Sequence, residues 1–404
     1  MLRLLLLSTP VGPIGSGLGG GVELTVANLA KALSVKGHQV TVVTPTGANL
    51  AAAGLANCCV GVVQIPGAVQ KTAQTQVRSA PIVTSTVLAN IWDYAHQVQL
   101  QYDLLVNFAY DWLPFYLTPF LDRPVAHFIS MGSLSDVMDT VIAQTSVRFP
   151  GTLGAYTTSQ VETFSHLHPL MNSLIDPPIN PLSDPPSDPP INSLTNWRVL
   201  GGGLNLDLYD YNPGPGTFLA WVGRISPEKG LEDAIAAATA AHQPLKIFGK
   251  IEDTDYWQAL QPKIEAAIRK SNLANPAESN LVEYCGFLPT EDLQKAIGQA
   301  QALLVTPHWI EAFGIVAIEA LACGVPVIAY SQGGLVEIVQ PGKTGYLVAP
   351  HDIDGLVQAI AKIDDINRAS CRAQAEKLYS LSAWSRRFEQ WFCCVASSDC
   401  HLLT

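Results

Sequence analysis

Short apolar runs alternate along the chain with segments in which apolar residues recur at helical spacing. The first such unit has an apolar run at 2–8, a helically spaced segment at 22–37 and a second apolar run at 39–45. Short apolar runs predict buried strands, and the segment between them predicts a helix that ends at Gly37. Because the order is strand, helix, strand, the expected sheet is parallel.

The same alternation continues towards the end of the chain. Further strands are expected at 103–109, 125–130, 217–226, 245–250, 281–288, 302–307 and 325–330, and further helices at 231–241, 315–322 and 382–392. Two series of this kind predict an α/β protein with two Rossmann-like, doubly wound parallel-sheet domains that face a central cleft. Ligands of such sheets bind at the carboxyl ends of the strands.

A proline-rich stretch marks the expected domain boundary. Three Asp-Pro-Pro repeats at 176–192 can form neither a helix nor a central strand, so they predict an extended insertion. The expected domains are therefore 1–197 and 198–382. The remaining segment, 383–404, is expected to form a helix and tail that pack back on the first domain.

Sparse charge narrows the possible partners. Only 14% of the 404 residues are charged, the net charge is −11, and few cations precede Arg198. This balance, without a basic amphipathic helix, argues against nucleic acid or an anionic membrane as a partner. Small molecules are the expected partners, no stable membrane association is expected, and the oligomeric state is left open.

Cysteine usage and the start of the chain bear on localisation. The eight cysteines show neither C-x-x-C spacing nor histidines at zinc-site intervals, so we expect reduced thiols in a cytoplasmic protein and no metal. The opening LRLLLLSTP has a short apolar core that Pro and Gly interrupt at once, so it predicts a first strand rather than a signal peptide. No apolar run is long enough to span a bilayer.

A glycine-rich loop follows the first predicted strand. It reads GPIGSGLGGG and contains G-x-G-x-x-G at 15, 17 and 20. The glycines trail the strand by several residues, and the second strand ends without the acidic residue that would bind a ribose, so a dinucleotide site is not expected. Bare N–H groups at Gly20 and Gly21 could still approach an anion at the start of the helix. The alternative is a flexible surface loop.

Two cations follow the strand that opens the second series. In WVGRISPEKG, Arg224 comes just after the strand and Lys229 lies five residues later. Either cation alone could form a surface salt bridge. Two cations on one strand–helix turn, in a chain with so few, favour a diphosphate clamp that needs no metal.

Two shorter motifs have simpler explanations. PGKTG at 341–345 resembles the end of a Walker A loop but lacks the earlier glycine, so an NTPase site is not expected. DTD at 253–255 matches the Asp-x-Asp pattern of metal-dependent sugar transfer. Such triplets are common, and this one is expected to cap the helix that follows it.

Two glutamates lie in the apolar stretch at 308–330. Charged residues are seldom buried without partners, so their placement calls for a ligand or a partner. Glu311 is expected in the loop after the strand at 302–307, and Glu319 inside the next helix. On a regular helix they would lie about 80° apart in azimuth, close enough for one ligand. The N–H groups of Phe313, Gly314, Ile315 and Val316 would form the positive end of that helix.

The stretch EAFGIVAIE resembles the E-x7-E motif of the retaining glycosyltransferases of family 4, which have the GT-B fold. The resemblance extends over nearly the whole chain through GGVELTVANLAKALSVKGHQV, GGLNLDLY, WVGRISPEKG and CGVPVIAYSQGGLVEIVQPGKTGYLVAP. It implies an acceptor-binding first domain, a second domain that binds a nucleotide sugar, and metal-independent transfer with retention of configuration.

The resemblance also implies roles for individual residues. Glu319 would accept hydrogen bonds from the nucleotide ribose, Glu311 would lie by the donor sugar, and Arg224 and Lys229 would neutralise the diphosphate. The donor site would also include Gly20, Gly21, Gly249, Phe287, Phe313, Gly314, Ile315 and Val316. The departing phosphate oxygen would take the acceptor's proton, so the two glutamates are not the acid and nucleophile of a retaining hydrolase.

One position departs from the family pattern. The family usually has a histidine after the strand that corresponds to PVAHFIS, where it contacts the donor sugar and the acceptor. By register this position is Ser130, while His127 lies three residues earlier. Either Ser130 replaces the histidine, or a backbone shift brings His127 to the site.

The acceptor is expected to contact the first domain, where aromatic residues are dense at 107–120. A stacking surface for the acceptor could be lined by Tyr110, Trp112, Phe115 and Tyr116. Asp111 and Glu23 would bind the acceptor through hydrogen bonds. The glycine-rich entrance and the missing histidine resemble the UDP-glucose:tetrahydrobiopterin glucosyltransferase branch. This favours glucosyl transfer to a reduced pterin. A different polyol or sugar acceptor and a non-catalytic sugar-nucleotide binding protein remain open.

Overall fold

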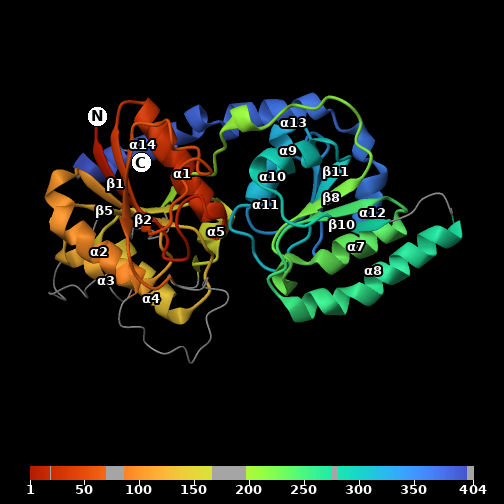
Figure 1. Ribbon diagram of the computed structural model, residues 1–404, viewed down its shortest axis with the longest axis horizontal. Helices are drawn as coiled ribbons and strands as arrows, with labels where there is room; N and C mark the ends of the chain where they lie inside the picture. Colours follow the sequence, from red (N-terminus) through yellow and green to blue (C-terminus); the bar gives the residue numbers. More distant parts are fainter. Residues whose placement is uncertain (19, 70–85, 166–196, 275–280, 398–404) are drawn as a thin grey trace, which may run out of the picture. The chain divides into compact units, whose positions relative to one another are not determined.

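The computed structural model describes residues 1–18, 20–69, 86–165, 197–274 and 281–397, and it divides into two compact α/β units (Figure 1). The first unit comprises Met1–Gly203 together with Leu381–Thr404, and the second comprises Leu204–Ser380. The sequence had suggested boundaries at 197 and 382. The Asp-Pro-Pro insertion at 176–192 lies outside the described residues.

A seven-stranded parallel sheet forms the centre of the first unit, in the order β3-β2-β1-β4-β5-β6-β7. Its strands are β1 (Arg3–Leu7), β2 (Gln39–Pro45), β3 (Val60–Ile65), β4 (Leu104–Asn107), β5 (Val125–Ile129), β6 (Leu153–Ala155) and β7 (Arg198–Val199). Its helices are α1 (Gly20–Val35), α2 (Val87–Val98), α3 (Trp112–Leu117), α4 (Asp136–Arg148), α5 (Thr158–Glu162) and α14 (Leu381–Ser397). All four strands expected in this part of the chain are present. Gly37 ends α1 with a φ of 88°, as predicted.

Helices cover both faces of this sheet. Leu5 and Leu7 pack with the apolar side of α2, whereas α1 and α14 contact each other on the opposite side (Figure 1). Helix α14 is fixed to the strand ends because the Trp384 indole donates to the Gly201 carbonyl oxygen at 2.9 Å and Trp391 packs on Gly154. A side chain at Gly154 would meet the Trp391 ring at 2.7 Å, so the close packing of the helix on the strand requires glycine there.

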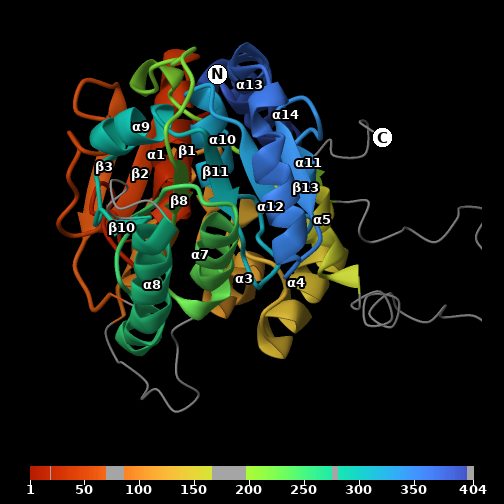
Figure 2. The ribbon, with the colours of Figure 1, turned by 90° about the vertical axis from the view of Figure 1, so that its right-hand side faces the viewer.

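The second unit has a six-stranded parallel sheet in the order β10-β9-β8-β11-β12-β13. Its strands are β8 (Leu219–Val222), β9 (Leu245–Phe248), β10 (Val282–Tyr284), β11 (Ala302–Val305), β12 (Val327–Tyr330) and β13 (Gly345–Val348). Its helices are α7 (Leu231–Ala240), α8 (Thr254–Ala274), α9 (Thr290–Gly298), α10 (Ile315–Ala322), α11 (Leu335–Ile338), α12 (Ile353–Ala361) and α13 (Arg368–Gln374). Helices α7, α8 and α12 lie together on one face and α9, α10 and α13 on the other (Figures 1 and 2). Two doubly wound parallel sheets confirm the predicted fold class.

The DTD triplet precedes α8 and acts as a helix cap. The Asp253 carboxylate accepts a hydrogen bond from the backbone N–H of Tyr256 at 2.8 Å. An acidic side chain at this position satisfies one of the N–H groups that the first turn of a helix leaves without a partner. The predicted capping role of the triplet is therefore confirmed.

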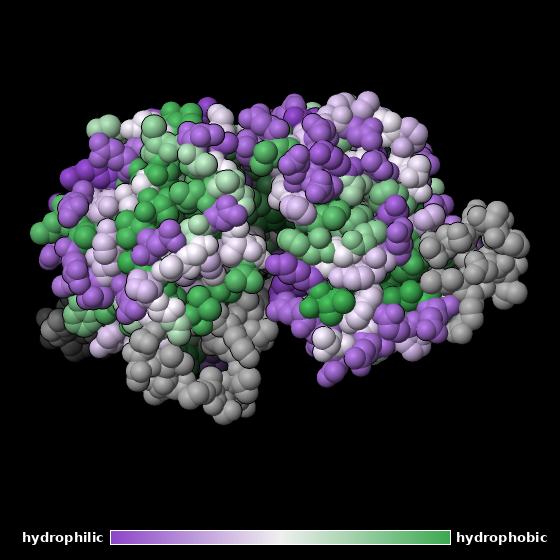
Figure 3. All heavy atoms as spheres, in the orientation of Figure 1, coloured by the Kyte–Doolittle hydropathy of each residue, from purple (hydrophilic) through white to green (hydrophobic). Residues whose placement is uncertain are grey.

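The described cysteines are all free thiols. Burial raises the pKa of Cys323 and of Cys371 to about 12, which keeps both thiols protonated and unreactive. Figure 3 shows apolar side chains among polar ones on the visible face of each unit. Among the helices of the described residues, none combines the length and the apolar character that a membrane span requires.

Candidate functional site

The carboxyl ends of the second unit's strands bring backbone segments unusually close together. Gly249 follows β9 with a φ of 150°, and a Cβ at this position would lie 1.7 Å from the Gly223 carbonyl oxygen. Only glycine fits there, so Gly249 allows the two strand ends to run side by side. Phe287, after β10, is 54% exposed, and the Lys250 ammonium lies 4.4 Å from its ring centroid.

Lys229 and Glu311 meet at this edge as a half-buried ion pair. The Lys229 Nζ lies 2.6 Å from Glu311 Oε2, and the Trp309 indole donates to the same oxygen at 3.2 Å. Lys229 also lies 4.8 Å from the Trp309 ring centroid. The turn after Lys229 is held by Thr306, whose hydroxyl donates to the Gly230 carbonyl oxygen at 2.8 Å. Two residues far apart in sequence are thus placed together, with the positive charge beside an aromatic face.

Arg224 is also paired with carboxylates. It forms ion pairs with Glu228 at 3.2 Å and with Glu252, and Ser226 donates to Glu228 at 2.8 Å. About a third of the Arg224 side chain remains exposed. Both cations that the sequence singled out therefore lie on the strand–helix turn after β8, each beside an acidic partner that an incoming anion would have to replace.

Glu319 is buried in α10, where its side chain accepts a hydrogen bond from the Tyr209 hydroxyl at 2.7 Å. Burial raises the pKa of Glu319 to about 7, and the Tyr209 hydrogen bond opposes this shift because it stabilises the charged form. Burial likewise raises the pKa of Tyr209 well above its usual value, so its hydroxyl stays a donor. The sequence did not identify Tyr209 as a partner, although it ends the quoted GGLNLDLY segment.

The loop that carries Glu311 is fixed through its backbone by two glycines. The Gly334 N–H donates to the Glu311 carbonyl oxygen at 2.7 Å, and a Cβ at Gly333 would lie 2.3 Å from the same oxygen. Gly314, with a φ of 105°, then turns the chain into α10 at Ile315. In the first turn of α10 the Ala317 N–H donates to the Gly314 carbonyl oxygen at 3.0 Å. The N-terminus of α10, which follows Glu311 by four residues in the chain, is the positive end of the helix. Sequence reasoning missed Gly333 and Gly334.

In the first unit, the structure places His127 in the core of β5. Its Nε2 lies 2.8 Å from the Thr118 hydroxyl, its Nδ1 lies 3.2 Å from the Asn107 amide, and its ring stacks on Phe115 at 4.3 Å. Burial lowers the pKa of His127 to about 3, so the imidazole is neutral. Both ring nitrogens are engaged and the side chain is fully buried, which argues against the backbone shift that would expose it. Ser130, directly after β5, is the better candidate for the family histidine's place.

Changing these two residues is expected to affect different properties. Ser130→Ala should lower the rate of transfer about tenfold with little change in stability, since it removes only a small hydroxyl at the strand end. His127→Leu should instead lower the free energy of unfolding by about 2–4 kcal/mol, because it leaves buried polar partners unsatisfied. Urea unfolding and rate measurements on both variants check this. An unchanged rate in Ser130→Ala would remove Ser130 from the site.

The glycine-rich loop is tied to the start of α1. The Glu23 carboxylate accepts hydrogen bonds from the Gly17 N–H at 3.0 Å and from the Ser16 hydroxyl at 3.3 Å. Gly20 has a φ of 58° and nothing within contact distance of a built Cβ, so the exposed Gly20–Gly21 turn leaves room for a ligand. Glu23, expected to bind an acceptor, holds this loop in place.

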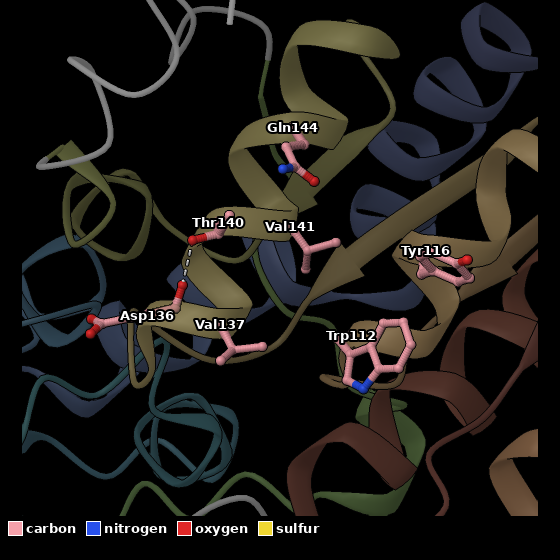
Figure 4. A pocket seen from close by; sticks show the side chains of 7 residues that line it. All are labelled: Trp112, Tyr116, Asp136, Val137, Thr140, Val141 and Gln144. Atoms are coloured by element: carbon pink, nitrogen blue, oxygen red, sulfur yellow. Dashed lines mark hydrogen bonds between the residues drawn. The ribbon is translucent and has the colours of Figure 1, made fainter. Parts of the chain in front are cut away.

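The aromatic segment after β4 forms one wall of an open hollow of about 430 Å³ (Figure 4). Trp112 and Tyr116 of α3 line it opposite Val137 and Val141 of α4, and the remaining lining residues are Asp136, Thr140 and Gln144. Trp112 and Tyr116 are 46% and 53% exposed, and their rings meet edge to face at 5.1 Å. The sequence indicated both Trp112 and Tyr116, but it gave no sign of the residues that α4 contributes. Phe115, which the sequence also indicated, is buried in the core instead.

The neighbouring residues Tyr110 and Asp111 have structural roles here. The Tyr110 hydroxyl donates to the Gly132 carbonyl oxygen at 3.2 Å, and the Asp111 carboxylate caps α3 by accepting from the Leu113 N–H at 3.0 Å. Burial raises the pKa of Asp111 above its usual value. Neither side chain is among those that line the hollow.

Family models match both units. Residues 212–378 match "Glycosyl transferases group 1" and residues 19–129 match "Glycosyltransferase Family 4". Two solved structures align with this chain over nearly their full length. HepE of Anabaena, in complex with UDP and glucose, aligns with a TM-score of 0.69 and 18% identity, over 96% of this chain and 99% of HepE. Sucrose-phosphate synthase of Thermosynechococcus elongatus aligns with a TM-score of 0.70 and 20% identity, over 98% of this chain and 100% of the synthase. The chain has the GT-B fold.

This GT-B chain also resembles curated glycosyltransferases over part of its length. It is 34% identical to the glycogen synthase of Mycobacterium tuberculosis over 165 aligned residues, which make up 39% of this chain and 37% of that protein. It is 34% identical over 163 residues to the D-inositol 3-phosphate glycosyltransferase of a Mycobacterium species, again 39% of this chain and 35% of that protein. The chain thus matches little more than a third of the length of these relatives. The group 1 match contains Arg224, Lys229, Glu311 and Glu319.

Proposed function

We propose that the protein is a retaining glycosyltransferase that moves a hexosyl group from a nucleotide sugar to a hydroxyl of a small soluble acceptor. The observation that carries this proposal is the Lys229–Glu311 pair beside the N-terminus of α10, the helix that contains the buried Glu319. Cations, a helix N-terminus and a carboxylate are the groups that a nucleotide diphosphate with a ribose diol needs. The family models over both units support the same assignment.

The donor is assigned to the second unit. The ribose hydroxyls would donate to Glu319, and the diphosphate would replace Glu311 and Glu228 as partners of Lys229 and Arg224. The negative charge that develops on the leaving diphosphate would then be stabilised by preorganised cations and N–H groups, without a metal ion in the transfer step. UDP-glucose is the preferred donor, since HepE of the same fold was solved with UDP-glucose.

The acceptor is assigned to the first unit and its open hollow. Trp112 and Tyr116 offer exposed aromatic rings on which a flat heterocycle can stack, and Gln144 offers an amide that can donate and accept. Its described lining has no Lys or Arg, which favours an uncharged acceptor over a phosphorylated one. A reduced pterin such as tetrahydrobiopterin has the required ring and a hydroxylated side chain. The alternative within the class is another sugar or polyol.

A donor and acceptor screen tests the proposal. UDP-, ADP- and GDP-sugars should be compared by thermal shift, and the best donor incubated with tetrahydrobiopterin, inositol and simple sugars before mass spectrometry of the products. We expect stabilisation by UDP-glucose and a mass gain of one hexose on the pterin, with added Mg²⁺ or Mn²⁺ leaving the rate unchanged. The anomeric coupling of the product reports retention. Stabilisation by NAD and by none of the sugar nucleotides would refute the assignment, and binding of a donor without any transfer would favour a non-catalytic binding protein.

A further inference from the structure

Three side chains from separate loops of the second unit converge on one point. Asp233 lies in the first turn of α7, His308 in the loop after β11, and His351 in the turn before α12. The His308 Nε2 lies 2.8 Å and the His351 Nδ1 3.4 Å from the same oxygen, Oδ2 of Asp233. One candidate ligand atom from each residue lies within 4.8 Å of the other two. None of the three has a role in the proposed sugar transfer.

These separations suit a small divalent cation. Ligand atoms around a tetrahedral zinc ion lie about 3.3 Å apart, because each is about 2.0 Å from the metal. The His351–Asp233 distance already meets this value, and the His308 ring has to withdraw only slightly from the carboxylate. Two imidazoles and one carboxylate are a donor set that first-row transition metals prefer over calcium or magnesium.

The surrounding residues supply the support that metal ligands normally have. The second ring nitrogen of His308, Nδ1, lies 4.0 Å from the carboxylate of Glu232, which is an ion-pair distance and too long for a hydrogen bond. Metal-binding histidines commonly have a carboxylate on this side of the ring. The Tyr330 hydroxyl donates to Asp233 Oδ2 at 2.6 Å and fixes that carboxylate. Glu232 in turn accepts a hydrogen bond from the Tyr256 hydroxyl. The Asp233 carboxylate is therefore held in place by Tyr330, a residue outside the cluster.

The backbone of His351 gives an independent indication. It has a φ of 63°, in the left-handed region that side chains other than glycine rarely adopt. Such a conformation costs on the order of 1 kcal/mol and is concentrated at functional sites. Although the His351 side chain is 62% exposed, its ring contacts that of His308, with the centroids 4.4 Å apart and the ring planes tilted by 56°. Its exposed side would give solvent access to a fourth coordination position.

We infer that Asp233, His308 and His351 bind one divalent transition-metal ion, with Zn²⁺ the best fit. The ion would connect the α7 turn, the β11 loop and the α12 turn. His308 is also joined to the Lys229 turn, because its N–H donates to the Glu228 carbonyl oxygen at 2.9 Å. The metal would therefore hold in place the loops that carry Lys229 and Glu311 without entering the transfer step.

Cobalt and zinc titrations of the full chain without an affinity tag test the inference. After dialysis against EDTA, Co²⁺ should bind with one ion per chain, produce visible d–d absorption without a cobalt–thiolate band, and be displaced by Zn²⁺. His351→Gln should weaken binding at least about tenfold. His242→Gln is the matched control, since His242 is an exposed histidine of the same unit with a similar φ of 53°.

The outcomes are independent of sugar transfer because no donor or acceptor is present. Loss of the metal in His351→Gln, with binding intact in His242→Gln, supports the site. Equal affinity in the two variants, a thiolate band, or failure of the unsubstituted protein to bind either ion would overturn it. A Zn²⁺-dependent rise in melting temperature that His351→Gln abolishes would confirm that the ion links the three loops.

Discussion

Replacing Lys229 by methionine is expected to lower kcat by about 100- to 1,000-fold, the effect of removing one preorganised charge from a transition state. Methionine keeps the apolar stem of lysine, so packing on Trp309 is largely preserved. The lost group is the ammonium, which lies 2.6 Å from Glu311 and would meet the leaving diphosphate. Steady-state rates with saturating donor, together with the melting temperature, measure the effect.

Lys246 provides a matched control for this substitution. It too lies in the second unit, forms an ion pair with Glu283 at 3.7 Å, and lies 4.7 Å from an aromatic ring centroid, that of Phe218. Lys246→Met removes the same ammonium group, but at a position that does not contact Glu311. The kcat of this variant should therefore remain near that of the unsubstituted protein. If Lys229→Met behaved in the same way, the Lys229–Glu311 pair would be an ordinary surface ion pair and the proposed diphosphate contact would be wrong.

The sheets were predictable because parallel strands covered on both faces must be continuously apolar. The short apolar run Ala302–Val305 therefore marked β11 without further information. Helix α4 was not predicted, since its buried side mixes the apolar Met138 and Ile142 with the polar Asp139, Thr145 and Ser146 and so gives no clear apolar stripe. The Asp-Pro-Pro insertion expected at 176–192 lies outside the described residues, so it stays a prediction that rests on the conformational limits of proline.

Site residues were predictable only where they belong to a motif with recognisable residue types at a fixed spacing. The resemblance indicated Glu311 and Glu319, but their fixed positions depend on Gly334 and Tyr209, which contact them from distant segments. No spacing rule could identify these partners, because tertiary structure alone brings them together. A lone histidine in a strand is usually a hydrogen-bonded core residue, but the sequence could not decide between this role and a place in the site for His127. Its hydrogen-bond partners belong to a neighbouring strand and a turn of helix.

The Asp233–His308–His351 cluster is invisible in the sequence for the same reason. Metal motifs are recognised when ligands share a helix or a tight loop, at fixed intervals along the chain. Here the three ligands come from three separate loops that meet where parallel strands end. The sequence predicted no metal site because such intervals are absent, and the proposed cluster departs from that prediction.

Glu319 is expected to make donor binding depend on pH near neutrality. Its pKa of about 7 means that much of the free protein carries the protonated acid, whereas the ribose hydroxyls donate to the carboxylate. Affinity for UDP-glucose should therefore rise with pH and be about tenfold weaker at pH 6 than at pH 8. Calorimetric titration with UDP-glucose, whose diphosphate does not titrate in this range, measures the effect. Glu319→Gln should bind more weakly with no pH dependence.

The same shift predicts how stability depends on pH in the absence of donor. Because the folded-state pKa of Glu319 lies above its ordinary value, the folded protein binds the extra proton, and this contribution is present at low pH and lost as pH rises through about 7. The loss is at most about 3 kcal/mol. The free energy of unfolding of Glu319→Gln, minus that of the unsubstituted protein, should rise as the pH is raised from 5 to 8. Urea unfolding measures this rise, which should not exceed about 3 kcal/mol.

Tyr209→Phe distinguishes a direct role of the Glu319 charge from a general effect of pH. Without the Tyr209 hydroxyl, the charged form of Glu319 loses a donor at 2.7 Å, so its pKa should rise further. The midpoint of the pH dependence of UDP-glucose binding should then move to higher pH, while the affinity at high pH changes less. If the midpoint stayed in place in Tyr209→Phe, or if Glu319→Gln kept the profile of the unsubstituted protein, another group would control the pH dependence. The ribose contact assigned to Glu319 would then have to be abandoned.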